Sequence, residues 1–144
     1  MWSQSVNDFM AWLKIEKALS ENTIKAYIND LSKFQAYLQA INSSATPQEV
    51  TSDMLSDFLV YEGKQGVQAR SQARLLSGVR AFYKYLLMDN LIDADPTHFL
   101  DYPKTGRKLP DVLTVQEIDD LLGAIDLSQP EGHRNKAMLE TMYS

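Results

Sequence analysis

The chain has 144 residues, and its 14 Lys and Arg against 19 Asp and Glu give it a formal net charge of −5. It contains no cysteine, which excludes disulfide frameworks, zinc ribbons and thiol catalysis. Its two histidines, His98 and His133, are far apart and outside any cluster of ligand residues, so we expect no metal site and no cofactor. No segment approaches the roughly 18 consecutive apolar residues of a membrane helix, and no leader pattern opens the chain. We therefore expect a cytoplasmic protein with no membrane partner and no small-molecule ligand.

Apolar residues recur at three- and four-residue spacings along most of the chain, which predicts an all-α fold. The first two helices are expected at 3–17 and 20–41. Their short connection favours an antiparallel hairpin. Ser3 or Ser5 is the expected cap of the first helix, and the second begins at Ser20, where capping side chains are frequent.

A polar loop separates this hairpin from two further helices. The third helix is expected to run from a cap at Thr51 or Ser52 to about Gly63. The fourth, which is about 30 Å long, is expected at 69–90. Four helices are enough to close a small bundle, so residues 1–91 form the first predicted domain.

Residues 92–110 have a different character, because three prolines interrupt any helical pattern. We expect an extended connector between two domains here. The second predicted domain, 111–144, begins with a helix that starts at a capping box, with Thr114 as the cap and Glu117 three residues later. Another helix is expected at 129–143.

The stretch from Lys64 to Met88 carries five basic residues and no acidic one, although the chain as a whole is acidic. On a helical wheel, its basic and small polar residues fall on one side, and its leucines and aromatic residues fall on the other. No Glu follows these cations at four-residue spacing, so no neighbour along the helix neutralises them. Such a face suits a polyphosphate, whereas the ordinary alternative is a solvated face whose Arg and Lys stems cover apolar surface. The basic side comprises Arg70, Arg74, Ser77, Lys84 and, at its edge, Arg80.

Four segments, in order, are similar to one known family. The run Leu19-Ser-Glu-Asn-Thr-Ile-Lys-Ala-Tyr-Ile-Asn-Asp-Leu31 resembles the S-x-N-T-x-x-x-Y-x-x-D-L signature near the N-terminus of Xer-type tyrosine recombinases and phage integrases. The later segments that resemble this family lie at 71–83, 95–110 and 113–143. Each match alone is weak, but together they cover nearly the whole chain.

The resemblance implies a four-helix, SAM-like core-binding bundle over 1–91, a proline-containing linker over 92–110 and the first two helices of a catalytic domain over 111–144. In that family the second and fourth helices lie against the major groove, and the linker passes along the DNA. The implied partner is double-stranded DNA, bound in a homo- or hetero-oligomeric recombinase complex. The DNA-binding residues predicted from the resemblance and the wheel are Asn22, Thr23, Lys25, Asn29, Arg70, Ser71, Arg74, Ser77, Arg80, Lys84, Lys104, Arg107 and Lys108.

The resemblance also implies that the intact parent is an enzyme, a DNA strand transferase. The catalytic arginines, lysine, histidine and tyrosine nucleophile of the family would all follow Ser144. We therefore expect residues 1–144 to bind DNA without cutting it. Tyr143 precedes the first catalytic arginine and is not expected to be the nucleophile. Neither Arg80 nor Arg134 is expected to be catalytic. Chromosome dimer resolution and mobile-element integration both stay open as the role.

Two questions about the basic face stay open from the sequence. Most of its cations are expected to contact phosphates, with room for one arginine to make a bidentate contact with a guanine. A different class of function is a helical protein-interaction module whose basic face binds an acidic partner. Carboxylates of the same molecule paired with Arg70, Arg74 and Lys84 would remove the proposed nucleic-acid surface.

Overall fold

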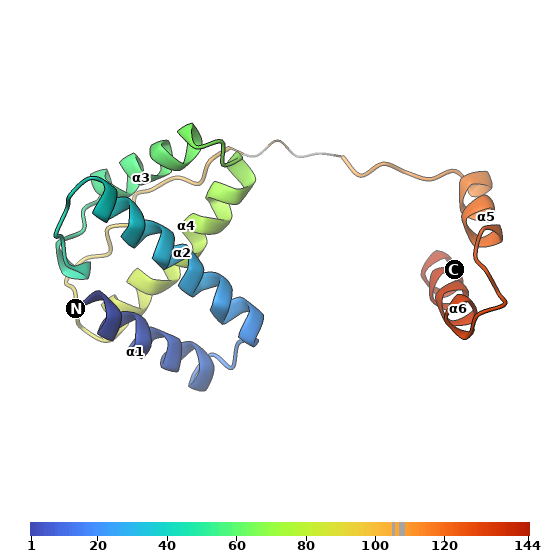
Figure 1. Cartoon of the computed structure of the whole chain (residues 1–144), viewed down its shortest axis with the longest axis horizontal. Helices are drawn as coiled ribbons and strands as arrows, with labels where there is room; N and C mark the ends of the chain where they lie inside the picture. Colours follow the sequence, from blue (N-terminus) through green and yellow to red (C-terminus); the bar gives the residue numbers. More distant parts are fainter. Residues whose placement is uncertain (105, 107–108) are drawn as a thin grey trace. The chain divides into compact units, whose positions relative to one another are not determined.

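A computed structural model describes residues 1–104, 106 and 109–144 (Figure 1). Over these residues the chain forms six α-helices, one short 3-10 helix and no strand, which confirms the all-α class. The chain divides into two compact units, Met1–Thr105 and Gly106–Ser144. No helix within the described ranges is both long enough and apolar enough to cross a membrane.

The first unit is a bundle of four helices, as the sequence predicts (Figure 1). The fourth helix packs against each of the other three, so its apolar side forms the middle of the core. A short 3-10 helix, η1, lies in the connection between the second and third helices. The elements are α1 (Trp2–Ile15), α2 (Glu21–Ala40), η1 (Pro47–Glu49), α3 (Ser52–Lys64) and α4 (Ala69–Met88).

The caps predicted from the sequence are present at α2 and α3 but not at α1. The hydroxyl groups of Ser20 and Thr51 each accept a hydrogen bond from the backbone amide three residues later, at 3.3 Å. The prediction of a serine cap for α1 is wrong, because this helix already begins at Trp2 and both Ser3 and Ser5 lie inside it. Packing of Trp2 in the core explains the earlier start.

Aromatic side chains from all four helices fill the core. Phe82 of α4 stacks on Trp2 with ring centroids 5.9 Å apart, and it meets Phe9 edge-on at 5.4 Å. Phe34 of α2 and Phe58 of α3 lie 5.1 Å apart. Full burial of one such side chain contributes about 1.5–3 kcal/mol, so this cluster is a main source of the stability of the bundle.

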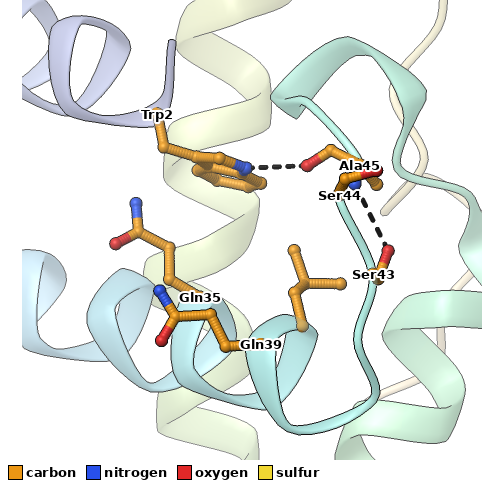
Figure 2. Close-up of a pocket in the computed structure, with 7 residues that line it drawn as sticks. Trp2, Gln35, Gln39, Ser43, Ser44 and Ala45 are labelled. Carbon is orange, nitrogen blue, oxygen red and sulfur yellow. Dashed lines mark hydrogen bonds between the residues drawn. The ribbon is translucent and has the colours of Figure 1, made fainter.

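Trp2 also holds the loop between α2 and η1 (Figure 2). Its indole N–H donates a hydrogen bond to the carbonyl of Ala45 at 2.8 Å. The hydroxyl of Ser43 accepts one from the amide of Ala45 at 3.3 Å. Gln35 and Gln39 of α2 line the small pocket next to the indole. The polar loop is therefore fixed to the bundle by the first residue of α1.

The residues after α4 return along the bundle instead of leaving it as an extended connector. We call residues 92–102 the strap. Within it, Leu100 packs against the core, Thr97 is fully buried, and the carbonyl of Pro96 accepts a hydrogen bond from the Ser52 hydroxyl at 2.6 Å. Prolines exclude a helix here, but they do not prevent an irregular segment from packing. The first unit therefore continues past the end of the fourth helix, where the sequence predicts a domain boundary.

The second unit contains two packed helices, α5 (Val115–Gly123) and α6 (Pro130–Tyr143). The predicted capping box is present at the start of α5. The Thr114 hydroxyl accepts a hydrogen bond from the Glu117 amide at 3.2 Å, and the Glu117 carboxylate accepts one from the Thr114 amide at 2.7 Å. Large apolar side chains of this unit are exposed, among them Leu109, Val112, Leu113, Val115, Met138 and Met142.

Candidate nucleic-acid interface

The outer side of α4 carries two free cations of the predicted DNA-binding face. Arg70 and Lys84 are both exposed and stand about 21 Å apart along the helix axis. Within the part of the chain that the structure describes, neither side chain makes an ion pair or a hydrogen bond. Ser71 is exposed beside Arg70. The opposite side of the helix is buried, as the wheel predicts, except for Leu87, which is exposed.

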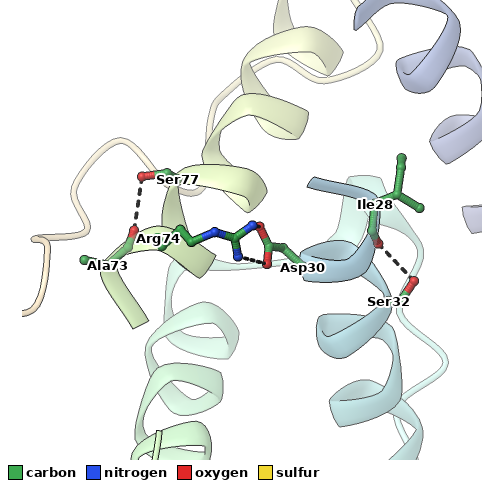
Figure 3. Close-up of polar contacts among 6 residues, drawn as sticks. All are labelled: Ile28, Asp30, Ser32, Ala73, Arg74 and Ser77. Carbon is green, nitrogen blue, oxygen red and sulfur yellow. Dashed lines mark hydrogen bonds and ion pairs between the residues drawn. The ribbon is translucent and has the colours of Figure 1, made fainter. Parts of the chain in front are cut away.

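Arg74 lies on the same side of α4, but it is not a free cation. Its guanidinium donates two hydrogen bonds to the carboxylate of Asp30 on α2, from Nη1 to Oδ1 at 2.9 Å and from Nη2 to Oδ2 at 3.3 Å (Figure 3). No neighbour along α4 neutralises Arg74, as predicted, but a carboxylate on another helix does, so Arg74 does not belong to the free basic surface. Since Arg70 and Lys84 have no such partner among the described residues, the basic surface is reduced but not removed.

Gly78 makes room for the carboxylate of Asp30 between α2 and α4. A Cβ at Gly78 would lie 3.0 Å from Cγ of Asp30 and would collide with its Oδ2. Burial raises the pKa of Asp30 from 3.8 to about 6, and the positive charges of Arg74 and Lys33 oppose this rise. Above that pH the carboxylate is mostly ionised, so its ion pair with Arg74 is the prevailing state at neutral pH.

Arg80, at the edge of the basic side, binds the strap. Its Nη2 donates hydrogen bonds to the carbonyls of Thr97 at 3.0 Å and Leu100 at 2.6 Å. The guanidinium also lies 4.5 Å from the centre of the Tyr102 ring, as in a cation–π contact. The hydroxyl of Tyr102 is 3.3 Å from that of Ser77. Arg80 and Ser77, both predicted to bind DNA, therefore contact the strap.

The predicted residues of α2 lie mostly on its exposed side. Asn22, Lys25 and Asn29 are exposed, and Thr23 is half-buried. The Thr23 amide donates to the Ser20 hydroxyl, so the cap uses one of the free amides that could have met a phosphate. Because α2 packs against α4, both helices contribute to the surface of the same unit.

The remaining predicted DNA-binding residues lie at the basic end of the predicted connector. Lys104 is exposed. Arg107 and Lys108 lie outside the described residues. The DNA contacts of all three stay predictions.

Reasoning from the sequence missed the roles of Asp30 and Tyr102. Asp30 stands three residues after Tyr27 and four before Phe34, which places it on the side of α2 that faces the core. A carboxylate in that position needs a cationic partner, and this was the signal available in the sequence. No comparable signal exists for Tyr102, because its contact with Arg80 depends on the path of the strap.

A family model described as phage integrase, N-terminal SAM-like domain, matches residues 6–90. These residues include most of α1 and all of α2, α3 and α4. The chain belongs to the phage integrase family. The bundle is the SAM-like domain of that family, and this confirms the resemblance found in the sequence.

Several curated tyrosine recombinases are similar to this chain over almost all of its length. The tyrosine recombinase XerD of Pseudomonas aeruginosa is 40% identical over 139 residues, which are 96% of this chain and 46% of the relative. That of Listeria innocua is 36% identical over 139 residues, 96% of this chain and 47% of the relative. That of Staphylococcus aureus (strain N315) is 37% identical with the same coverage. The chain therefore spans about half the length of the curated relatives it matches.

Proposed function

We propose that this chain is the DNA-binding portion of a site-specific tyrosine recombinase and that it holds duplex DNA for strand exchange. The proposal is supported by the SAM-like family match and by relatives that are named tyrosine recombinase XerD. The protein would act in the cytoplasm, as one subunit of a homo- or hetero-oligomeric complex assembled on DNA. Chromosome dimer resolution and mobile-element integration both fit this role.

The observation that carries the proposal is the outer side of α4. Arg70 and Lys84 remain exposed and without an acidic partner among the described residues, in a chain whose net charge is −5. In such a chain, free cations on one side of a helix give a local positive field. Such a field attracts a polyphosphate, because phosphate contacts release condensed counterions.

The test is a measurement of duplex binding by the Arg70→Ala/Lys84→Ala double variant. Affinity for a fluorescently labelled, mixed-sequence duplex is measured by anisotropy over a range of salt concentrations. If both side chains contact phosphates, the double variant binds all sequences more weakly, and its log–log salt slope becomes shallower by about 2. The matched control is Lys14→Ala/Lys17→Ala, which removes the same charge from α1 and the turn after it.

Equal losses in the two double variants would mean that only net charge matters, and the proposed surface would then be wrong. Competition distinguishes the rival function, a protein-interaction module with an acidic partner. Unlabelled duplex should displace the labelled duplex at much lower charge concentration than polyglutamate does. If polyglutamate competes equally well, the basic face binds any polyanion and the protein-interaction function is favoured.

A further inference from the structure

The ion pair between Arg74 and Asp30 is part of the packing between two helices. The carboxylate of Asp30 is fully buried, whereas the side chain of Arg74 is 53% exposed. Gly78, one turn after Arg74, leaves the space that the carboxylate occupies. Figure 3 shows Arg74 reaching from α4 towards Asp30 on α2. One end of the guanidinium is therefore held by a buried carboxylate, although about half of the Arg74 side chain is exposed.

This pairing makes Arg74 a poor ligand for phosphate. A buried carboxylate next to the guanidinium cancels its charge, so the pair as a whole releases few counterions when DNA binds. Arg70 and Lys84, which have no carboxylate partner among the described residues, keep their full charge. The three cations on one side of α4 therefore differ in what they offer to DNA.

The same pairing makes Arg74 well suited to hydrogen bonding with a base. A guanidinium carries five N–H donors in one plane. The two bonds to Asp30 use one donor on each terminal nitrogen. Three donors remain, one each on Nε, Nη1 and Nη2, and those on Nε and Nη2 point in parallel along a second edge of the group. Two parallel donors match O6 and N7 of guanine in the major groove. Because these acceptors are neutral, the contact depends more on the direction of the two N–H groups than on the net charge of the side chain.

We propose that Arg74 recognises a guanine in the major groove and that Asp30 is the positioning residue that fixes its guanidinium for this contact. Arg70 and Lys84 contact phosphates instead. This inference rests on the proposed function, that the bundle binds duplex DNA. It also assigns a role to the aspartate of the S-x-N-T-x-x-x-Y-x-x-D-L signature, which is Asp30 in this chain.

The proposal predicts opposite effects on affinity and on specificity when Asp30 is replaced. Asp30→Asn frees the charge of Arg74, so affinity for mixed-sequence duplex should rise and the salt slope should steepen by about 1. The guanidinium also loses its fixed orientation, so selection of guanine should weaken. A bidentate arginine contact discriminates roughly 5- to 150-fold against the wrong base, and most of this factor should be lost. A purely structural ion pair would leave base selection unchanged.

In the experiment, the 144-residue chain selects duplexes from a pool with a randomised central segment, and the bound duplexes are sequenced. The native chain should enrich sites with a fixed guanine, and Asp30→Asn should lose enrichment at that position only. Replacing this guanine by 7-deazaguanine should weaken native binding but not binding by Asp30→Asn. The matched control is Asp57→Asn, which removes one exposed carboxylate of α3 and should change neither base selection nor salt slope.

Arg74→Lys provides a second variant, in which the replaced residue is exposed and the positive charge beside Asp30 is kept. It keeps the charge but lacks the planar donor pair, so guanine enrichment should fall while the salt slope stays the same. If Asp30→Asn does not fold, as judged by circular dichroism, Arg74→Lys decides the question. Retained guanine enrichment in Arg74→Lys would overturn the inference. A native chain that binds duplex without selecting guanine also overturns it, whereas a native chain that binds no duplex overturns the proposed function.

Discussion

Replacing Asp30 with Asn should change how the stability of the bundle depends on pH. Burial raises the pKa of this carboxyl from 3.8 to about 6, against the opposing charges of Arg74 and Lys33. Between these two pH values the folded chain binds more protons at Asp30 than the unfolded chain does. Its contribution to stability is therefore present below about pH 4 and is lost as the pH rises through about 6. Each unit of difference between the folded and unfolded pKa is worth 1.36 kcal/mol, so the loss of stability reaches about 3 kcal/mol.

The assay compares urea unfolding of the native chain and of Asp30→Asn, followed by circular dichroism at about pH 4 and at about pH 7. Asn cannot ionise, so the difference in unfolding free energy between the two proteins should move by up to about 3 kcal/mol in favour of Asn over this range. Other carboxylates titrate in both proteins and cancel in the difference. One of them is Glu49, whose pKa is lowered by hydrogen bonds from the amide and hydroxyl of Thr46.

Parallel pH profiles for the two proteins would refute this reasoning. They would mean that Arg74 compensates the buried charge completely, and that Asp30 titrates as it does in the unfolded chain. If the native chain instead gained stability relative to Asp30→Asn above about pH 6, the contradiction would be stronger, because folding would then have to lower the pKa of Asp30.

Two other substitutions test the packing around the basic side of α4. Gly78→Ala should destabilise the bundle by about 1–3 kcal/mol in urea unfolding, because its methyl group would collide with Asp30. Gly63→Ala should cost less, because its nearest neighbour would be Nε2 of Gln72 at 3.0 Å, a side-chain end that, among the described residues, donates only to the carbonyl of Val67. Equal effects of the two substitutions would contradict the close contact at Gly78. Arg80→Ala should cost about 1–3 kcal/mol, because it removes the donor to two carbonyl groups of the strap. Amide hydrogen exchange should then accelerate within the strap while the core of α4 stays protected, and uniform acceleration would show that Arg80 supports the whole bundle instead.

Local features of this fold could be predicted from the sequence because the residues that determine them are neighbours in the chain. The caps at Ser20 and Thr51 and the capping box at Thr114 each involve residues only three positions apart. The buried side of α4 follows from the spacing of its apolar residues. Such patterns are set by helix geometry and do not depend on the tertiary structure.

The partners of the cations could not be predicted in the same way. Asp30 and Arg74 are 44 residues apart, and their contact requires the packing of α2 on α4 and the absence of a side chain at Gly78. The strap is a similar case. Its prolines correctly excluded a helix, but no local pattern encodes the burial of Thr97 or the hydrogen bond that its carbonyl accepts from Arg80.

The three arginines on this part of α4 therefore have three different roles despite their common side of the wheel. Arg70 is free among the described residues, Arg74 is neutralised by a buried carboxylate, and Arg80 donates to backbone carbonyls. Only an exposed and unneutralised cation adds fully to the phosphate contacts that determine salt dependence. A count of basic residues in the sequence consequently overestimates the number of free cations on this face. Two hydrogen bonds restrict the guanidinium of Arg74 and two restrict that of Arg80, but only Arg74 is paired with a carboxylate. In general, contacts to phosphate position a protein on DNA, whereas directed donors in the major groove distinguish one base from another.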